Sequence, residues 1–388
     1  MSACDASQSR SPTEPERSLR DDVWNDDEFD AVRYARKAPF PWFGGKSKAA
    51  PLVWQLLGDV EHYVEPFAGS LAVLLNRPHL CNRPYHSETV NDVDALLVNA
   101  WRGIQFAPDA VAEAASWPVS EACKSARQIA LLRWRNEYGA ERIAGDPRFF
   151  DPEMAGWWLW AVAVQIGAFT GDGAWTADPA TGRIMKMPRT ALRKPGVTRA
   201  RPHLSDSGNG VCGPALREPG VAEYNSSDTN DFHPITMPRL RWWMQLLSAR
   251  LRHVRICNGD WSRVCTTSAM HTLSVHNGGV CGVFLDPPYD SAERAKGLYS
   301  ADDGSVAAAC RAWAIEAGRD PRNRIVLAGY DVEHRELLAH GWREYEWFKR
   351  TNLLAGGINK TSGLRERLWA SPHCLQPNAQ PQQHDLFA

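Results

Sequence analysis

Residues 60–75 read VEHYVEPFAGSLAVLL, and this stretch predicts how the fold begins. Residues 60–65 have the composition of a strand, residues 66–70 form a tight turn around one glycine, and residues 71–75 continue as a short apolar helix. A second strand is expected at 88–92, followed by a helix over residues 95–104. Strand, glycine turn, helix and strand in this order open an α/β sheet.

Three more strands are predicted near the other end of the chain, at 280–285, 324–330 and 367–370. The stretch between the two groups of strands has helical patterns at 122–138, 157–165 and 240–251, and a long loop-rich segment from 167 to 238. The expected fold class is therefore an α/β sheet interrupted by a mainly helical, loop-rich insert.

We expect the chain to divide into five segments. They are a polar and acidic tail (1–37), the first part of the sheet domain (38–110), the insert (111–254), the second part of the sheet domain (255–372) and a flexible tail rich in Pro and Gln (373–388).

Composition excludes several classes of protein. Hydrophobic residues at 44% and charged residues at 23% are ordinary globular values. No uncharged apolar run approaches the ~20 residues that cross a bilayer, and the first residues do not form a signal peptide. The nine cysteines are scattered singly, which favours a reduced cytoplasmic protein over a disulfide scaffold or a zinc site. No metal is expected. A monomer is expected, because the sequence has no obvious apolar stripe for dimerisation.

The first chemical motif is PWFGGKS at residues 41–47. Gly-Lys-Ser suggests a phosphate-binding loop, but that loop needs a glycine where this chain has Phe40, and no strand precedes it. A nucleoside-triphosphate site is therefore excluded. A glycine turn with a surface lysine is the alternative to a functional Lys46.

The second motif combines the turn of residues 65–70 with Asp92 at the end of the next strand. A tight glycine turn lets the backbone approach a ligand, and an acidic residue at the following strand end can accept both hydroxyls of a ribose. The alternative role of Asp92 is to cap the next helix, for which Asp94 competes.

The third motif, Asp286-Pro287-Pro288-Tyr289, directly follows an apolar strand. Two prolines end the strand in a rigid turn without amide donors, which presents a carboxylate, carbonyl oxygens and an aromatic ring. This set suits an exocyclic amine on a planar base. A proline-rich surface turn is the alternative.

Together these blocks resemble the DNA adenine N6-methyltransferases of the Dam type. Trp42-Phe43-Gly44-Gly45-Lys46, Glu65-Pro66-Phe67-Ala68-Gly69-Ser70, Asn91-Asp92 and Asp286-Pro287-Pro288-Tyr289 follow the order of the α group, and members borne by phages and prophages are most similar. The resemblance covers residues 39–104 and 280–372. It implies a Rossmann-like, S-adenosylmethionine-dependent catalytic domain with a target-recognition domain in the insert.

The resemblance also implies the roles of individual residues. The residues expected at the S-adenosylmethionine site are Trp42, Gly44, Gly45, Lys46, Glu65, Phe67, Gly69, Asp92 and Asp286. The target adenine is expected to lie against Asp286, Pro287, Pro288 and Tyr289. One departure is Leu71, which stands where the family often has a second glycine, and this puts the close backbone approach in doubt.

Duplex DNA is the expected partner. Seven basic residues without an acidic one lie between Thr181 and Leu204, namely Arg183, Lys186, Arg189, Arg193, Lys194, Arg199 and Arg201. A second basic group comprises Arg239, Arg241, Arg250, Arg252 and Arg255. Both fit phosphate contacts, with a solvated basic loop as the alternative. The tryptophans at 157, 158, 160, 242 and 243 are expected in the core.

The function implied is a site-specific transfer of a methyl group to N6 of a flipped-out adenine, within the bacterial or phage-infected cytoplasm and with or without a partner restriction enzyme. No cysteine nucleophile is needed. Cytosine N4 or RNA methylation, and an inert DNA-binding homologue, remain as alternatives. The segment Gln383-His384-Asp385-Leu386-Phe387 is similar to bacterial sliding-clamp-binding motifs, although five residues also match by chance.

Overall fold

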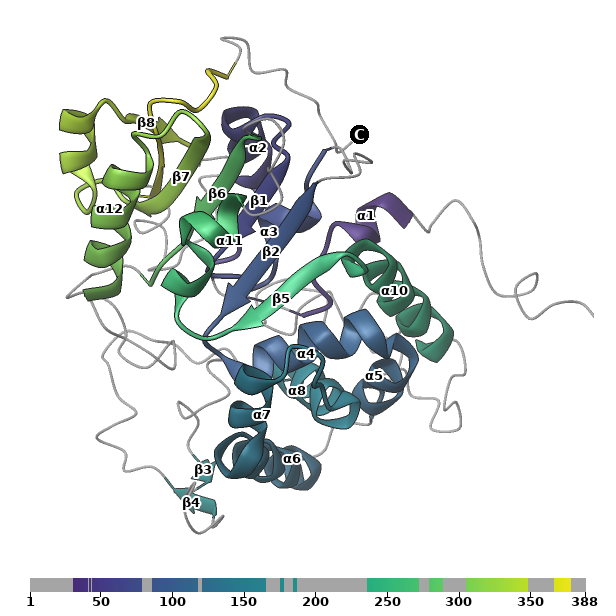
Figure 1. The fold of residues 1–388 in the computed structure, drawn as a ribbon. Coiled ribbons are helices and arrows are strands. Elements are labelled where there is room, and N and C mark those ends of the chain that lie inside the picture. Colours follow the sequence, from purple (N-terminus) through teal and green to yellow (C-terminus); the bar gives the residue numbers. More distant parts are fainter. Residues whose placement is uncertain are drawn as a thin grey trace, which may run out of the picture.

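The protein is described from a computed structural model, which covers residues 31–40, 42, 44–78, 86–117, 121–164, 175–177, 184–186, 236–271, 279–288, 305–347 and 366–377. Within these residues, seven strands form one sheet (Figure 1). In spatial order they are β5 (Val254–Asn258), β2 (Ser87–Asp92), β1 (His62–Glu65), β6 (Cys281–Leu285), β7 (Asn323–Tyr330), β9 (Glu366–Ala370) and β8 (Arg343–Glu346).

The sheet is mostly parallel. The pairs β5–β2, β2–β1, β1–β6 and β6–β7 are parallel, whereas β9 runs antiparallel to β7 and β8. The strand order reverses at β1, since the chain moves outward through β2 and β5 on one side and through β6 and β7 on the other. Open α/β sheets bind ligands at such a reversal, beyond the carboxyl ends of the strands.

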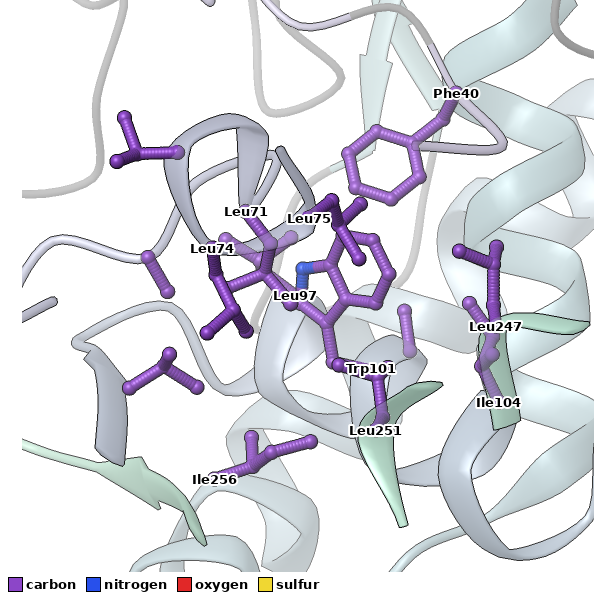
Figure 2. Close-up of a cluster of buried hydrophobic side chains, with 14 of the residues drawn as sticks. Phe40, Leu71, Leu74, Leu75, Leu97, Trp101, Ile104, Leu247, Leu251 and Ile256 are labelled. Atoms are coloured by element: carbon purple, nitrogen blue, oxygen red, sulfur yellow. The ribbon is translucent and has the colours of Figure 1, made fainter. Parts of the chain in front are cut away.

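Helices cover both faces of the sheet. One face packs against η5 (Trp261–Val264), α11 (Thr267–His271), α12 (Ser305–Ala317) and η6 (Arg335–His340). The other packs against α2 (Ala50–Leu57), α3 (Ala72–Leu75) and α4 (Ala95–Phe106). This second cluster joins α3 and α4 to β5 and to α10 (Thr236–Leu251). As a result, one core contains the side chains of Leu71, Trp101, Leu251 and Ile256 (Figure 2).

The helices after α4 belong to this same core, although the sequence predicted only those at 122–138, 157–165 and 240–251. They are α5 (Pro108–Ala115), α6 (Glu121–Trp134), α7 (Ala140–Gly145), α8 (Pro152–Val164) and α10 (Thr236–Leu251). Of these, α5, α8 and α10 pack against α4, and Trp158, Trp160 and Trp243 are buried, as expected. Figure 1 shows α4, α5 and α8 beside β5. The described part of the insert is thus a helical layer on the sheet, and a separate recognition domain remains a prediction.

Two further elements differ from the sequence interpretation. The single helix expected at 122–138 ends at Trp134 and continues as a π-helical turn, η2 (Arg135–Gly139), where Gly139 leaves room for the Trp134 ring. Beyond α8, the insert contributes a small hairpin of β3 (Trp175–Ala177) and β4 (Ile184–Lys186).

The sequence interpretation assigned residues 1–37 to a polar tail, and the structure differs from it at the carboxyl end of this segment. Residues 31–35 form α1 (Ala31–Ala35), and the Tyr34 ring packs edge-on against Trp243 with ring centroids 5.0 Å apart. The Trp243 indole N–H donates to the Tyr34 carbonyl over 2.9 Å. Aromatic burial therefore docks this segment on α10, although its composition is polar. None of the described helices is long and apolar enough to cross a membrane.

Candidate active site

The predicted site residues gather at the carboxyl edge of the sheet. Glu65 ends β1, Asp92 ends β2, and Asp286 follows β6 directly. Because β2, β1 and β6 are adjacent and parallel, these carboxylates lie along one edge, at the reversal of strand order. The structure thus brings the second and third motifs together, although they lie almost 200 residues apart in the sequence.

The turn after β1 is built around Gly69. Its φ of 47° lies in the left-handed region that favours glycine, and a Cβ there would approach the Trp42 indole nitrogen to 2.7 Å. The Gly69 amide donates to Asp92 Oδ2 over 3.0 Å, while its carbonyl accepts from the Trp101 indole over 2.9 Å. The turn therefore links Trp42 and Asp92 through backbone that only glycine can supply.

Leu71 adopts the same left-handed conformation, with φ 54° and ψ 25°. It is the one described residue other than glycine with a positive φ. Its side chain is fully buried beside α3 and α4 (Figure 2). The backbone path that a glycine would favour is therefore kept, and the burial of an apolar side chain offsets its strain.

Asp92 is not the helix cap. Asp94 holds that position, and its carboxylate accepts from the Leu96 amide over 2.9 Å. The two oxygens of Asp92 accept from the amides of Gly69 and Asp94 over 3.0 Å each, which leaves further lone pairs for hydroxyl donors. Burial raises the pKa of Asp92 to about 6, against the hydrogen bonds from those amides, so the carboxylate is ionised at neutral pH.

Lys46 and Asp286 form an ion pair at the centre of the edge. Lys46 Nζ lies 2.9 Å from Asp286 Oδ2 and donates to the Gly44 carbonyl over 2.8 Å. The Lys46 side chain is only 4% exposed and that of Asp286 22%, so a surface lysine is excluded. Pro287 is buried next to the pair. The pair joins the Gly-Gly-Lys block to the Asp-Pro-Pro block across 240 residues of sequence.

Glu65 is a buried carboxyl group on the same edge. Its Oε2 accepts from the Tyr63 hydroxyl over 2.9 Å and from the Leu74 amide over 3.2 Å. Burial raises the pKa of Glu65 to about 8, against these hydrogen bonds, and the negative charge of Asp286 raises it further. Glu65 is therefore mostly protonated at neutral pH, and Asp286 is the charged acid beside Lys46.

Two features of this edge were missed in the sequence. Phe67 stacks on Trp261 of η5 with ring centroids 6.2 Å apart and an interplanar angle of 26°. Glu366, the first residue of β9, is partly buried. Burial raises its pKa, the charge of Lys46 lowers the pKa, and the charge of Asp286 raises it. Trp261 could have been found by assigning residues 254–258 to a strand, since it then follows a strand end.

Several predicted residues lie outside the described part of the chain. They are Tyr289, Arg183, Arg189, Arg193, Lys194, Arg199, Arg201 and Gln383–Phe387. Lys186 lies in β4, where only the backbone is described.

Arg250, one member of the second basic group, forms a buried ion pair instead of facing solvent. Both of its terminal nitrogens bond to the Glu88 carboxylate, at 2.7 and 2.9 Å, and one also donates to the Leu74 carbonyl. The side chains of Arg250 and Glu88 are each 8% exposed. Arg250 therefore joins α10 to β2 and cannot contact a phosphate. Its assignment to a phosphate-binding group in the sequence interpretation was wrong. Arg255 on β5 remains exposed.

The comparisons agree with this geometry. Comparison with curated proteins gives no match. Residues 42–124 match the model of the family described as D12 class N6 adenine-specific DNA methyltransferase. The matched segment contains Trp42, Lys46, the Gly69 turn and Asp92, and the mostly parallel sheet is consistent with a methyltransferase fold. The match confirms the resemblance over residues 42–124 and is consistent with a Dam-type adenine methyltransferase.

Proposed function

We propose that this protein transfers a methyl group from S-adenosylmethionine to N6 of an adenine at a specific sequence of duplex DNA. The family implies adenine N6 methylation of DNA. The observation that carries the finer proposal is the buried Lys46–Asp286 pair, which lies at the reversal of strand order on the same edge as Asp92 and the Gly69 turn.

The chemistry of the side chains on this edge fits S-adenosylmethionine. Lys46 offers a cation for the carboxylate of its methionine part, and Asp92 offers acceptors for the ribose hydroxyls. The stacked rings of Phe67 and Trp261 follow β1 and β5, the strands that flank β2, and offer an aromatic surface for its adenine. When bound, the cofactor supplies a methyl group that is activated by a positively charged sulfur.

Asp286 and the Pro287 carbonyl then act on the target amine. The lone pair of an adenine amine is delocalised into its ring, so the amine is a weak nucleophile. Hydrogen bonds from its two hydrogens to Asp286 and Pro287 favour a pyramidal nitrogen with a localised lone pair. The proton lost after transfer passes to Asp286 or to solvent, and positioning with electrostatic stabilisation supplies the acceleration.

The protonated Glu65 contributes to this arrangement. Two adjacent ionised carboxylates repel each other, which favours the neutral form of the more buried one. With Glu65 neutral, the negative charge at this point of the edge is held by Asp286, where the amine acquires positive charge.

In a duplex the target base is stacked and paired, so it must be flipped out. We assign Tyr289 to stack on the flipped adenine and the basic stretch from Arg183 to Arg201 to contact phosphates, as the sequence indicates. Figure 1 shows the β3–β4 hairpin near α6, and β4 belongs to this basic stretch.

The test is methyl transfer from labelled S-adenosylmethionine to unmethylated duplex DNA, with nucleoside analysis of the product. Asp286→Asn keeps the shape of the side chain and removes its charge, and Asp109→Ala on the exposed start of α5 is the matched control. We expect N6-methyladenine from the unmutated protein and the control only. N4-methylcytosine, methylated RNA alone, or no product would overturn the proposal.

A further inference from the structure

Four neighbouring strands have a polar residue at the same edge of the sheet, at the end of β1 and β7, directly after β6 and at the start of β9. Side chains alternate between the two faces of a strand. Tyr63, Phe284, Ala328 and Leu368 belong to the core on the α2 face. By this alternation Glu65, Asp286, Tyr330 and Glu366 lie on that same face, on β1, β6, β7 and β9 in spatial order.

The strand register places Glu366 at the height of the site. Tyr330 pairs with Glu366, and Leu327, three residues earlier on β7, pairs with Leu285, the residue before Asp286. Glu366 therefore lies beyond the carboxyl end of β6, two strands away from Asp286 and on the same edge.

Lys46 faces this row of acids from the α2 side. Its carbonyl accepts the amides of Ala49 and Ala50, where α2 begins, and α2 packs on β6 and β7. Its ammonium group reaches Asp286 directly. Burial raises the pKa of Glu366, while the charge of Lys46 lowers it and that of Asp286 raises it, as expected for charges on the same edge and face of the sheet.

The neighbouring arginine does not neutralise Glu366. Arg367 alternates to the opposite face, where its guanidinium group pairs with Glu344 and Glu346 on β8 at 3.0 Å each. The charge of Lys46 lowers the pKa of Glu366 against the effect of burial.

We infer that Glu366 is a positioning residue that holds Lys46 at the edge while Asp286 accepts the target amine. This inference rests on the proposed function. In the protein without substrate, Asp286 is the acid in contact with Lys46. When the amine donates to Asp286, this contact weakens, and a second fixed negative charge keeps the ammonium group facing the cofactor carboxylate.

A double-mutant cycle on cofactor affinity tests the inference. With duplex DNA present, Glu366→Gln should weaken binding of S-adenosylhomocysteine, the unreactive cofactor product with the same carboxylate, about fivefold in calorimetry. Glu366→Asp should stay within about twofold, because it keeps the charge. In a Lys46→Met background the Glu366→Gln change should have no further effect. A role in strand stability alone would weaken binding equally in both backgrounds and would lower the melting temperature.

Glu346→Gln is the matched control, because it removes an exposed acid on the adjacent β8. It should leave binding unchanged. Equal losses from Glu366→Gln with and without Lys46, or no loss at all, would overturn the inference while leaving the proposed function intact. Failure of the unmutated protein to bind S-adenosylmethionine would overturn both.

Discussion

At Leu71 a left-handed backbone coincides with a completely buried side chain. The two conditions oppose each other when the residue is changed. Leu71→Ala removes the buried group and keeps the backbone strain, whereas Leu71→Gly removes both. Large-to-small changes in a core cost about 2–5 kcal/mol, and the left-handed conformation costs an L residue roughly 1–2 kcal/mol.

We therefore expect Leu71→Gly to be at least as stable as Leu71→Ala in urea unfolding, the reverse of the usual order. Leu74, one turn later in the helical α3 and equally buried, is the control. There Gly should be less stable than Ala by roughly 1 kcal/mol. The same order at both positions would contradict the explanation.

Asp92 predicts a pH dependence of cofactor binding. Its pKa, raised to about 6 by burial, means that the carboxylate is ionised above this pH and protonated below it. Because the ionised form is the better acceptor for ribose hydroxyls, the affinity for S-adenosylmethionine should fall as the pH drops through about 6.

Calorimetric titrations between about pH 5 and 8 check this expectation. Asp92→Asn should weaken binding about tenfold at neutral pH and flatten this part of the profile. Asp94→Asn retains a capping side chain and should keep the pH dependence, with its midpoint moved to lower pH, because the Asp94 charge that raises the pKa of Asp92 is removed. An unchanged pH dependence in Asp92→Asn would assign it to another group.

The strands and helices show which signals a sequence carries. The strands β1, β2, β6, β7 and β9 were predicted from the sequence, and the clearest signal is the apolar run of β6, which ends in Asp-Pro-Pro. In contrast, β5 was missed, since charged Arg255 interrupts its short apolar run at the edge of the sheet. Lys46 and Asp286 were found through motifs, whereas Glu366 carries no local signal, because its place depends on the pairing of β9 with β7.

The link between α10 and β2 predicts a large loss of stability on mutation. Burial alone would raise the pKa of Glu88, but hydrogen bonds and charges from Arg250 and Arg77 lower it. Arg250→Met should reduce the free energy of unfolding by about 3–5 kcal/mol, because the buried Glu88 carboxylate would keep only Arg77 as a charged partner. Chemical denaturation measures this loss.

Arg255→Met is the control for that measurement, because this side chain is exposed and, among the described residues, donates a hydrogen bond to Ser87 alone. It should change the unfolding free energy by less than about 1 kcal/mol. Comparable losses from both substitutions would contradict the distinction between the buried arginine and the exposed one.

At the scale of the molecule, the larger of the two hydrophobic clusters in the described residues extends from α1 through the helical layer to β9. The sequence predicted two domains because the texture of residues 111–254 differs from that of the sheet. Composition does not show that α5, α8 and α10 pack on α4, since long-range packing depends on faces that meet only after folding.

Two shortened chains test the role of α1 in this core. Removal of residues 1–30 should leave the melting temperature unchanged, as expected for the predicted tail. Removal of residues 1–37 should lower it by roughly 2–8 °C, because it uncovers Trp243 and deletes its hydrogen-bond acceptor at Tyr34. Equal melting temperatures for the two chains would show that α1 adds nothing to the core.

The position of β9 also bears on how the protein is synthesised. On a translating ribosome β7 and β8 emerge first, yet within the described sheet β8 pairs only with β9, which lies between them. Until β9 emerges, the nascent chain presents an open edge on β7, and exposed strand edges invite pairing with other chains. Slow translation just before residue 366 would prolong this exposure, so the yield of soluble protein should depend on codon choice there.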